Sequence, residues 1–221
     1  MPVSDTALNV VAVSGSLNDP SKTTVLVREI SRRLGEHLPI TEHLIRVNEL
    51  GPSLAGALTR DEVSAEVEAE LRRIETADVL IVGSPVYRAS FTGLFKHLFD
   101  FVDQYALADT PVFLAATGGS ERHALIIEHQ FRPLFSFFQA LTLPLGVYAH
   151  NSDFTHYELT SQLLAARIEK AITHGLPLIR SSAVEKRRVL GGVGVDGVAT
   201  DTATINIPQP VDPTTPVRLY S

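Results

Sequence analysis

The sequence predicts an α/β protein built on a doubly wound, five-stranded parallel sheet with helices on both faces. Three observations predict this class. Five short runs rich in Val, Ile and Leu do not alternate with polar residues, which is typical of strands buried on both faces. Amphipathic helical patterns separate these runs. The chain of 221 residues, 44% of them hydrophobic, is long enough to fill one core.

The elements follow in order along the chain. The strands are expected at residues 9–13, 40–46, 79–83, 111–116 and 143–149. After the first strand, Ser21 is the candidate N-cap of a helix whose apolar face carries Leu26, Ile30, Leu34 and Leu38. The next helix carries Val63, Val67, Leu71 and Ile74. A third helix begins at Thr92 and Gly93, and a fourth is expected over residues 123–141.

From Ser181 onward this alternation gives way to a segment rich in Gly, Pro and Thr. We therefore expect one domain over residues 1–180 and an extension over residues 181–221 that is extended or partly mobile. The extension contains the pattern G-x-G-x-x-G at Gly192, Gly194 and Gly197. No helical periodicity follows it, so no dinucleotide site is predicted there.

Composition excludes several classes of function. The net charge of -6 is spread along the chain, which predicts neither a nucleic acid partner nor a membrane surface. The absence of cysteine excludes a thiolate nucleophile and thiolate metal ligands. The eight histidines form no H-E-x-x-H motif, and no metal site is predicted. The start of the chain lacks a basic stretch followed by a long apolar one, so we expect a cytoplasmic location.

The loop after the first strand reads GSLNDPSKTT. It lacks the glycine that precedes the lysine in the phosphate loop of nucleotide triphosphatases, and no serine has the G-x-S-x-G frame of a hydrolase. What remains is a group of hydroxyls at the amino end of a helix, where unpaired N–H groups favour an anion such as a phosphate monoester. These hydroxyls belong to Ser16, Ser21, Thr23 and Thr24. A turn whose hydroxyls only cap the helix is the alternative.

Two further loops follow strands that end at the same edge of the predicted sheet. In the first, Pro85 stiffens the backbone and Tyr87 offers an aromatic face. In the second, Gly118 and Gly119 allow the main chain to approach a ligand closely. Taken singly, these features also fit a helix cap and a tight turn. Together they predict a planar heterocycle with a polar rim at the carboxyl ends of the strands.

The segments GSPVYRASFTGLFKHLFDFVD and ATGGSERHALIIEHQFRPLFSFFQALTLPLGVYA resemble the NAD(P)H-dependent FMN reductases of two-component alkanesulfonate and methanesulfonate monooxygenases, over roughly residues 8–180. The resemblance implies a flavodoxin-like fold, with FMN and NADH or NADPH as cofactors, and it favours NADH. It implies that the FMN phosphate is held by Ser16, Ser21, Thr23 and Thr24. It also implies that the isoalloxazine is flanked by Pro85, Val86, Tyr87 and Ser90, and its pyrimidine edge by Thr117, Gly118 and Gly119.

The sequence departs from this family at two places. Many relatives carry an arginine early in the first loop, where this chain has Leu17 and Asn18. Lys22 is then the only cation within the loop, so phosphate affinity is expected to be modest. The second departure is the extension from Ser181, which we do not match to the family and to which we assign no role.

The implied reaction is hydride transfer from NAD(P)H to FMN, which leaves reduced to supply an FMNH2-dependent monooxygenase, in sulfonate desulfurisation. No protein acid or base is required, so no catalytic side chain is assigned, and Arg88 and Arg122 are candidate contacts for the pyridine nucleotide. Two alternatives stay open. FMN could be permanently bound in a reductase of quinones, azo dyes or metal oxyanions, or the protein could be an electron carrier like flavodoxin, whose T/S-x-T-G-x-T loop is not reproduced here.

The helix expected over residues 123–141 has too many apolar residues for an ordinary surface helix. It either lies deep in the core or forms a subunit interface, and we expect a homodimer or a homotetramer. Pro133 cannot donate a hydrogen bond to the carbonyl of His129, so the helix should bulge or kink. In some relatives a π-type insertion occurs at the place of His129. The alternative is an ordinary proline kink with His129 solvated.

Overall fold

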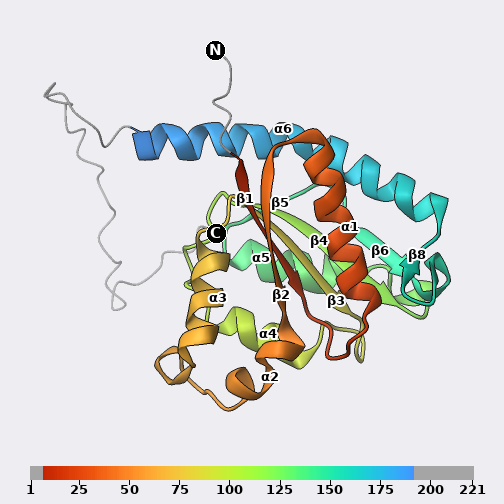
Figure 1. Ribbon diagram of the computed structural model, residues 1–221, viewed down its shortest axis with the longest axis horizontal. Helices are drawn as coiled ribbons and strands as arrows, with labels where there is room; N and C mark the ends of the chain where they lie inside the picture. Colours follow the sequence, from red (N-terminus) through yellow and green to blue (C-terminus); the bar gives the residue numbers. More distant parts are fainter. Residues whose placement is uncertain (1–6, 192–221) are drawn as a thin grey trace, which may run out of the picture.

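The computed structural model describes residues 7–191, and within them the predicted α/β class is confirmed (Figure 1). The sheet has the order β2-β1-β3-β4-β5, and all of its pairings are parallel. Its long strands are β1 (Leu8–Ser14), β2 (Ile40–Arg46), β3 (Val79–Pro85) and β4 (Pro111–Gly118). β3 and β4 are buried along almost their whole length, which explains why their sequences do not alternate.

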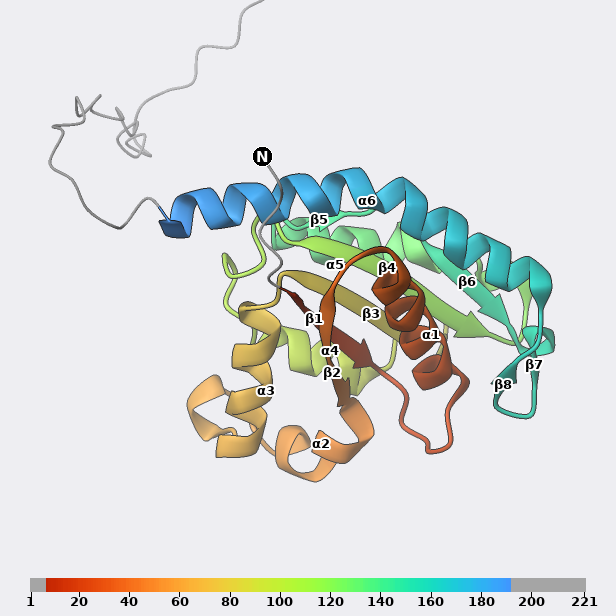
Figure 2. The same ribbon diagram turned by 45° about the horizontal axis from the view of Figure 1, so that its top comes forward.

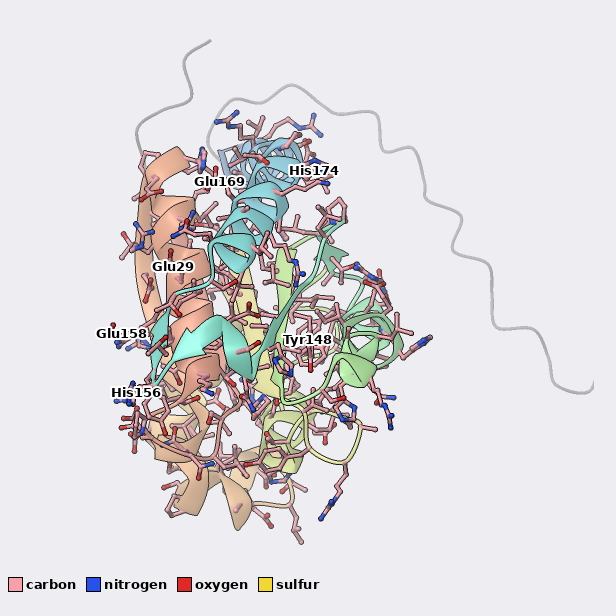
Figure 3. All side chains as sticks on the ribbon, turned by 90° about the vertical axis from the view of Figure 1, so that its right-hand side faces the viewer. Glu29, Tyr148, His156, Glu158, Glu169 and His174 are labelled. Carbon is pink, nitrogen blue, oxygen red and sulfur yellow. The ribbon has the colours of Figure 1, made fainter. Side chains whose placement is uncertain are left out.

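Helices cover both faces of the sheet. One face carries α2 (Val47–Ala55), α3 (Ala65–Glu75), α4 (Gly93–Asp100) and α5 (Arg132–Phe137). The other carries α1 (Lys22–His37) and α6 (Gln162–Gly191), which contact each other at an angle (Figures 1 and 2). Glu169 of α6 binds His37 at 2.8 Å, and with Glu29 it lies on this outer face (Figure 3). The two cores therefore sit on opposite faces of one sheet.

The fifth strand is shorter than the predicted run over residues 143–149. It is split into β5 (Leu141–Thr142) and β6 (Val147–His150), which both pair with β4. Pro144 lies in the interruption and cannot donate a hydrogen bond to a neighbouring strand. At Gly146 a Cβ would overlap Ile127, so the missing side chain lets that residue approach the sheet.

The predicted irregularity near His129 is confirmed, because residues Ile127–Phe131 form a π-helical turn ahead of α5. The N–H of Arg132 reaches back to the carbonyl of Ile127. The extent predicted for this helix was too long, since α5 ends at Phe137. Much of its apolar excess belongs to the core, where Phe131 and Phe135 are fully buried.

The extended conformation expected from Ser181 onward is wrong for residues 181–191, because α6 continues as a helix to Gly191. Contacts with the residues just before β3 and β4 explain why the helix continues. The ammonium group of Lys186 lies 3.0 Å from the carboxylate of Asp78 and 3.1 Å from the carbonyl of Ala77, and the Ser182 hydroxyl donates to the carbonyl of Asp109 at 2.9 Å. Residues 192–221, with the G-x-G-x-x-G pattern, lie outside the described residues. Within residues 7–191 no helix is both long and apolar enough to cross a bilayer.

β7 (Phe154–Thr155) and β8 (Glu158–Leu159) form a short hairpin between β6 and α6. Short 3-10 turns cover Arg60–Glu62, Glu121–His123 and Asn151–Asp153.

Candidate functional site

The carboxyl ends of β1, β3, β4 and β6 meet at one edge of the sheet (Figure 2). The strand order reverses between β1 and β3, and ligands of doubly wound sheets bind outside this reversal. The candidate residues lie in the loops that follow β1, β3 and β4 or at the ends of the elements that flank these loops. Backbone contacts join these loops, since the N–H of Gly15 donates to the carbonyl of Gly83 at 2.7 Å and that of Val86 to the carbonyl of Thr117 at 2.8 Å.

The β1 loop has the features of an anion site. Ser21 caps α1 by accepting from the N–H of Thr24 at 3.3 Å, as predicted. The side chain of Ser16 is 5% exposed, and its hydroxyl donates to the carbonyl of Asn18 at 3.1 Å. Within the described residues, the N–H groups of Ser16 and Leu17 donate no hydrogen bond. Together with the free N–H groups of the first turn of α1, these donors can bind a phosphate.

The two threonines of α1 have different surroundings. The Thr23 hydroxyl lies 2.6 Å from the hydroxyl of Thr117, and both side chains are buried. This contact connects a residue predicted for the phosphate with one predicted for the ring. The Thr24 hydroxyl is instead paired with that of Ser14 at 2.8 Å. The hydroxyls of Thr24 and Ser16 are thus both engaged within the protein, Ser16 with Asn18, whereas the hydroxyl of Ser21 only accepts and keeps its proton for a ligand.

The β3 loop is a tight turn in which Tyr87 and Ser90 exchange two backbone hydrogen bonds, at 2.8 and 3.1 Å. Arg88 and Ala89 occupy its centre with φ values of 51° and 64°. Such values are strained for residues other than glycine, and they occur at functional sites. The turn leaves Tyr87 43% exposed, while Pro85 and Val86, which precede it, are half-buried.

The Ser90 hydroxyl donates to the side-chain oxygen of Gln130 at 3.2 Å. This bond attaches the β3 loop to the π-helical turn. His129, in the same turn, is exposed.

The β4 loop offers main-chain donors. Within residues 7–191, the N–H groups of Gly119 and Ser120 donate no hydrogen bond. A Cβ at Gly119 would lie 3.2 Å from the amide nitrogen of Asn151, so any side chain there would be crowded. The position of this loop beside the Tyr87 turn fits the polar rim of a flat ring.

Sequence reasoning missed one contact of Thr92 and two further residues, Asn151 and Tyr148, that shape this edge. Thr92 was recognised as the cap of α4, but its hydroxyl also donates to the carbonyl of Gly15 at 2.8 Å and so joins the β1 loop to α4. Asn151 accepts from the ammonium group of Lys22 through its side-chain oxygen at 3.2 Å. Tyr148 donates to the carbonyl of Ser120 at 2.6 Å. The polar run after the fifth strand was the available signal for Asn151, because that strand ends at the same edge.

A cation from outside the β1 loop adds to the charge around it, while Lys22 stays the only cation of the segment GSLNDPSKTT itself. Arg46, at the end of β2, lies 3.7 Å from the carboxylate of Asp19 in this loop. Lys22 itself is directed towards Asn151 and lies 5.8 Å from the centre of the Phe154 ring. Both cations are therefore at the rim of the loop.

The strongest electrostatic pairings lie on helices away from the edge. The guanidinium of Arg32 lowers the pKa of Glu29 on α1, that of Arg60 lowers the pKa of Glu68 on α3, and that of Arg132 lowers the pKa of Glu128. Such pairs stabilise the surface and are not the environment of a catalytic acid or base. The edge is suited to holding a ligand by main-chain groups, hydroxyls and apolar faces.

The fold and this edge define a flavodoxin-like α/β protein with a candidate site for a phosphorylated planar ring. Comparison with known proteins gives the family. Residues 8–155 match the model of the NADPH-dependent FMN reductase family. The chain belongs to this family and is an FMN reductase that uses NADH or NADPH.

Individual relatives support the same family assignment. The chain is 57% identical to the NADH-dependent FMN reductase SfnF of Pseudomonas fluorescens, over 77% of this chain and 91% of the relative. It is 53% identical to an NADPH-dependent FMN reductase of Pseudomonas aeruginosa, over 76% of this chain and 91% of the relative. Among solved structures, an oxidoreductase from Corynebacterium diphtheriae superimposes with a TM-score of 0.71 at 32% identity, covering 79% of this chain and 98% of that one.

Proposed function

We propose that the protein reduces FMN at the carboxyl edge formed by the β1, β3 and β4 loops and releases it for an FMNH2-dependent monooxygenase of sulfonate desulfurisation. One observation carries the placement. Unpaired N–H groups occur on both sides of the edge, at Ser16 and Leu17 in one loop and at Gly119 and Ser120 in the other. The first pair suits a phosphate and the second suits the polar rim of a ring.

FMN supplies the acceptor for a hydride from the nicotinamide. The chain's own residues bind and orient. Ser16, Ser21 and Thr23 hold the phosphate, with Thr24 behind them. Pro85, Val86, Tyr87 and Ser90 form the wall beside the ring, and Thr117, Gly118 and Gly119 line its pyrimidine edge. N–H groups held in place there stabilise the negative charge that reduction adds to the ring, because they need no reorganisation.

For the electron donor we propose a preference for NADH, supported by the 57% and 56% identical relatives, which are both described as NADH-dependent. Arg88, at the tip of the strained turn, and Arg122 are the candidate contacts of the pyridine nucleotide. Among the side chains that the structure describes, their guanidinium groups have no ion-pair or hydrogen-bond partner. Initial rates at matched concentrations of NADH and NADPH test the preference, and a faster rate with NADPH contradicts it.

The assay that tests the function is anaerobic bleaching of free FMN by a trace of protein with excess NADH. Multiple turnovers of free FMN support a reductase that releases its product. Bleaching of one equivalent only indicates an electron carrier. Turnover that requires an added quinone, azo dye or metal oxyanion indicates a reductase with permanently bound FMN. Transfer to a sulfonate monooxygenase is then tested by coupling the two proteins and measuring sulfite release.

The homodimer or homotetramer also belongs to this proposal. Leu125 and Phe137 support it, because they flank the π-helical turn and are 63% and 64% exposed. Replacing Phe137 with Ser should lower the mass measured by light scattering, and an unchanged monomer mass in the unmodified protein would contradict an oligomer. A cytoplasmic location stays a prediction.

A further inference from the structure

Tyr148 is a buried residue that the reaction does not use directly. It lies on β6 opposite Ala116 of β4, and its side chain is 8% exposed against the core on the α4 and α5 face (Figure 3). Its hydroxyl donates to the carbonyl of Ser120 at 2.6 Å. That carbonyl also accepts from the N–H of His123 at 3.1 Å, so one oxygen connects β6 with the turn after β4.

Gly118 and Tyr148 determine each other. A Cβ at position 118 would overlap the hydroxyl of Tyr148 and would lie 3.1 Å from the ring carbon that bears it. The phenol therefore occupies the space that a side chain at position 118 would need. Glycine is therefore required at position 118 because of Tyr148, whether or not a ligand also approaches the main chain of this residue.

The hydrogen bond to Ser120 fixes the main chain that carries the two unpaired N–H groups of the β4 loop. One of these N–H groups belongs to Ser120, whose carbonyl accepts the hydrogen bond from Tyr148, and the other belongs to Gly119, the residue before it. Without the anchor, the loop of two glycines has access to more backbone conformations. FMN would then have to order the loop when it binds, and the free energy that this ordering costs would lower the affinity for FMN.

We propose that Tyr148 is a positioning residue, which holds the Gly118–Ser120 main chain in the conformation that binds the ring edge of FMN. The inference rests on the proposed function, since it assumes that FMN binds at this edge. It assigns Tyr148 no contact with FMN and no proton transfer. The expected consequence is on FMN affinity, beyond any effect on folding.

The test compares Tyr148→Phe, Gly118→Ala and the double variant, with Tyr105→Phe as a control. Tyr105 is 64% exposed and precedes β4 at the opposite edge of the sheet. The dissociation constant of FMN is measured by quenching of flavin fluorescence, and thermal unfolding without FMN shows that each variant is folded. Tyr148→Phe should weaken FMN binding by about threefold to tenfold, which corresponds to one hydrogen bond, and Tyr105→Phe should not.

The double variant gives the sharper result. Gly118→Ala alone should weaken FMN binding more than Tyr148→Phe, because the new methyl group displaces the hydroxyl. Removing that hydroxyl in the double variant should restore part of the loss, so the double variant should bind FMN more tightly than Gly118→Ala. An unchanged affinity in folded Tyr148→Phe, or a double variant no better than Gly118→Ala, would overturn this inference alone. No uptake of FMN by the unmodified protein would overturn the proposed function as well.

Discussion

The buried pair of hydroxyls between α1 and β4 makes a prediction about stability that can be separated from binding. Thr23 and Thr117 lie 2.6 Å apart and are 1% and 5% exposed. Changing one of them to Val leaves the other hydroxyl buried without its partner, which costs about 1–3 kcal/mol of unfolding free energy. Changing both removes the need for the bond, so the double variant should lose less than about 1 kcal/mol.

Urea unfolding of the two single variants and the double variant measures this coupling. Thr155 and Thr160 serve as a matched control, because their hydroxyls lie 3.0 Å apart but are exposed, and water replaces a lost partner. Single changes there should cost little. If the double variant at Thr23 and Thr117 loses as much as the two single variants added together, the hydroxyls do not stabilise each other and the reasoning is refuted.

The same double variant tests binding in a folded protein. Thr23 is proposed to hold the FMN phosphate, and a hydrogen bond to a charged group contributes about 1.5–3 kcal/mol. Its loss should weaken FMN binding by roughly tenfold to a hundredfold. Riboflavin, which lacks the phosphate, should lose less affinity than FMN, because only the contact of Thr117 with the ring edge is lost from it. An equal loss for both ligands would show that Thr23 does not contact the phosphate.

Three further outcomes are expected. Thr92→Val removes the cap of α4 and leaves a main-chain carbonyl of the β1 loop unpaired, so it should lower the unfolding free energy by about 2–4 kcal/mol in urea, whereas Thr92→Ser should cost less than half of this. Gly119→Val crowds Asn151 and the ring edge and should lower kcat/KM for FMN by about tenfold or more, and unchanged turnover would contradict the assignment. Arg132 lowers the pKa of Glu128, so their pair stabilises the fold above the ordinary pKa of that carboxyl and loses this contribution as pH falls through the lowered value. In Glu128→Gln the unfolding free energy should therefore fall less steeply in acid than in the unmodified protein. The difference should be under about 1 kcal/mol, because the Glu128 side chain is 48% exposed. An unaltered pH profile of the unfolding free energy would argue against the pairing.

Local patterns predicted most of the sheet because strands buried on both faces are apolar throughout. The runs at residues 79–83 and 111–116 lie within β3 and β4, and the cap at Ser21 is where the sequence placed it. The fifth strand was the exception. Its composition predicts a continuous strand, but Pro144 and the approach of Ile127 to Gly146 divide it, and the second effect depends on a contact between distant segments.

The conformation of residues 181–191 was predicted wrongly for a similar reason. Lys186 and Ser182 contact residues just before β3 and β4 and hold the helix against the domain. Tertiary contacts of this kind are not visible in a single sequence.

The candidate site was predictable as a set of loops but not as a set of contacts. The rule that ligands bind beyond the carboxyl ends of the strands selects the β1, β3 and β4 loops. It does not reveal that Thr24 is paired with Ser14, or that Gly118 makes room for Tyr148. Both facts depend on the side of the loop on which a side chain lies. From the sequence, Gly118 is explained by the close approach of a ligand, and the structure adds a second reason for glycine there, the hydroxyl of Tyr148.

The central claim is that FMN binds at the carboxyl edge of the sheet, and a crystal structure of the complex with FMN tests it most directly. The account predicts the phosphate within hydrogen-bonding distance of the N–H groups of Ser16 and Leu17, and the ring between Tyr87 and the Gly118–Gly119 main chain. The chain also has a groove of about 630 Å³ between α1 and the β7–β8 hairpin, lined by Arg28 and Tyr157 among others. FMN bound in that groove, with the carboxyl edge unchanged, would contradict the account.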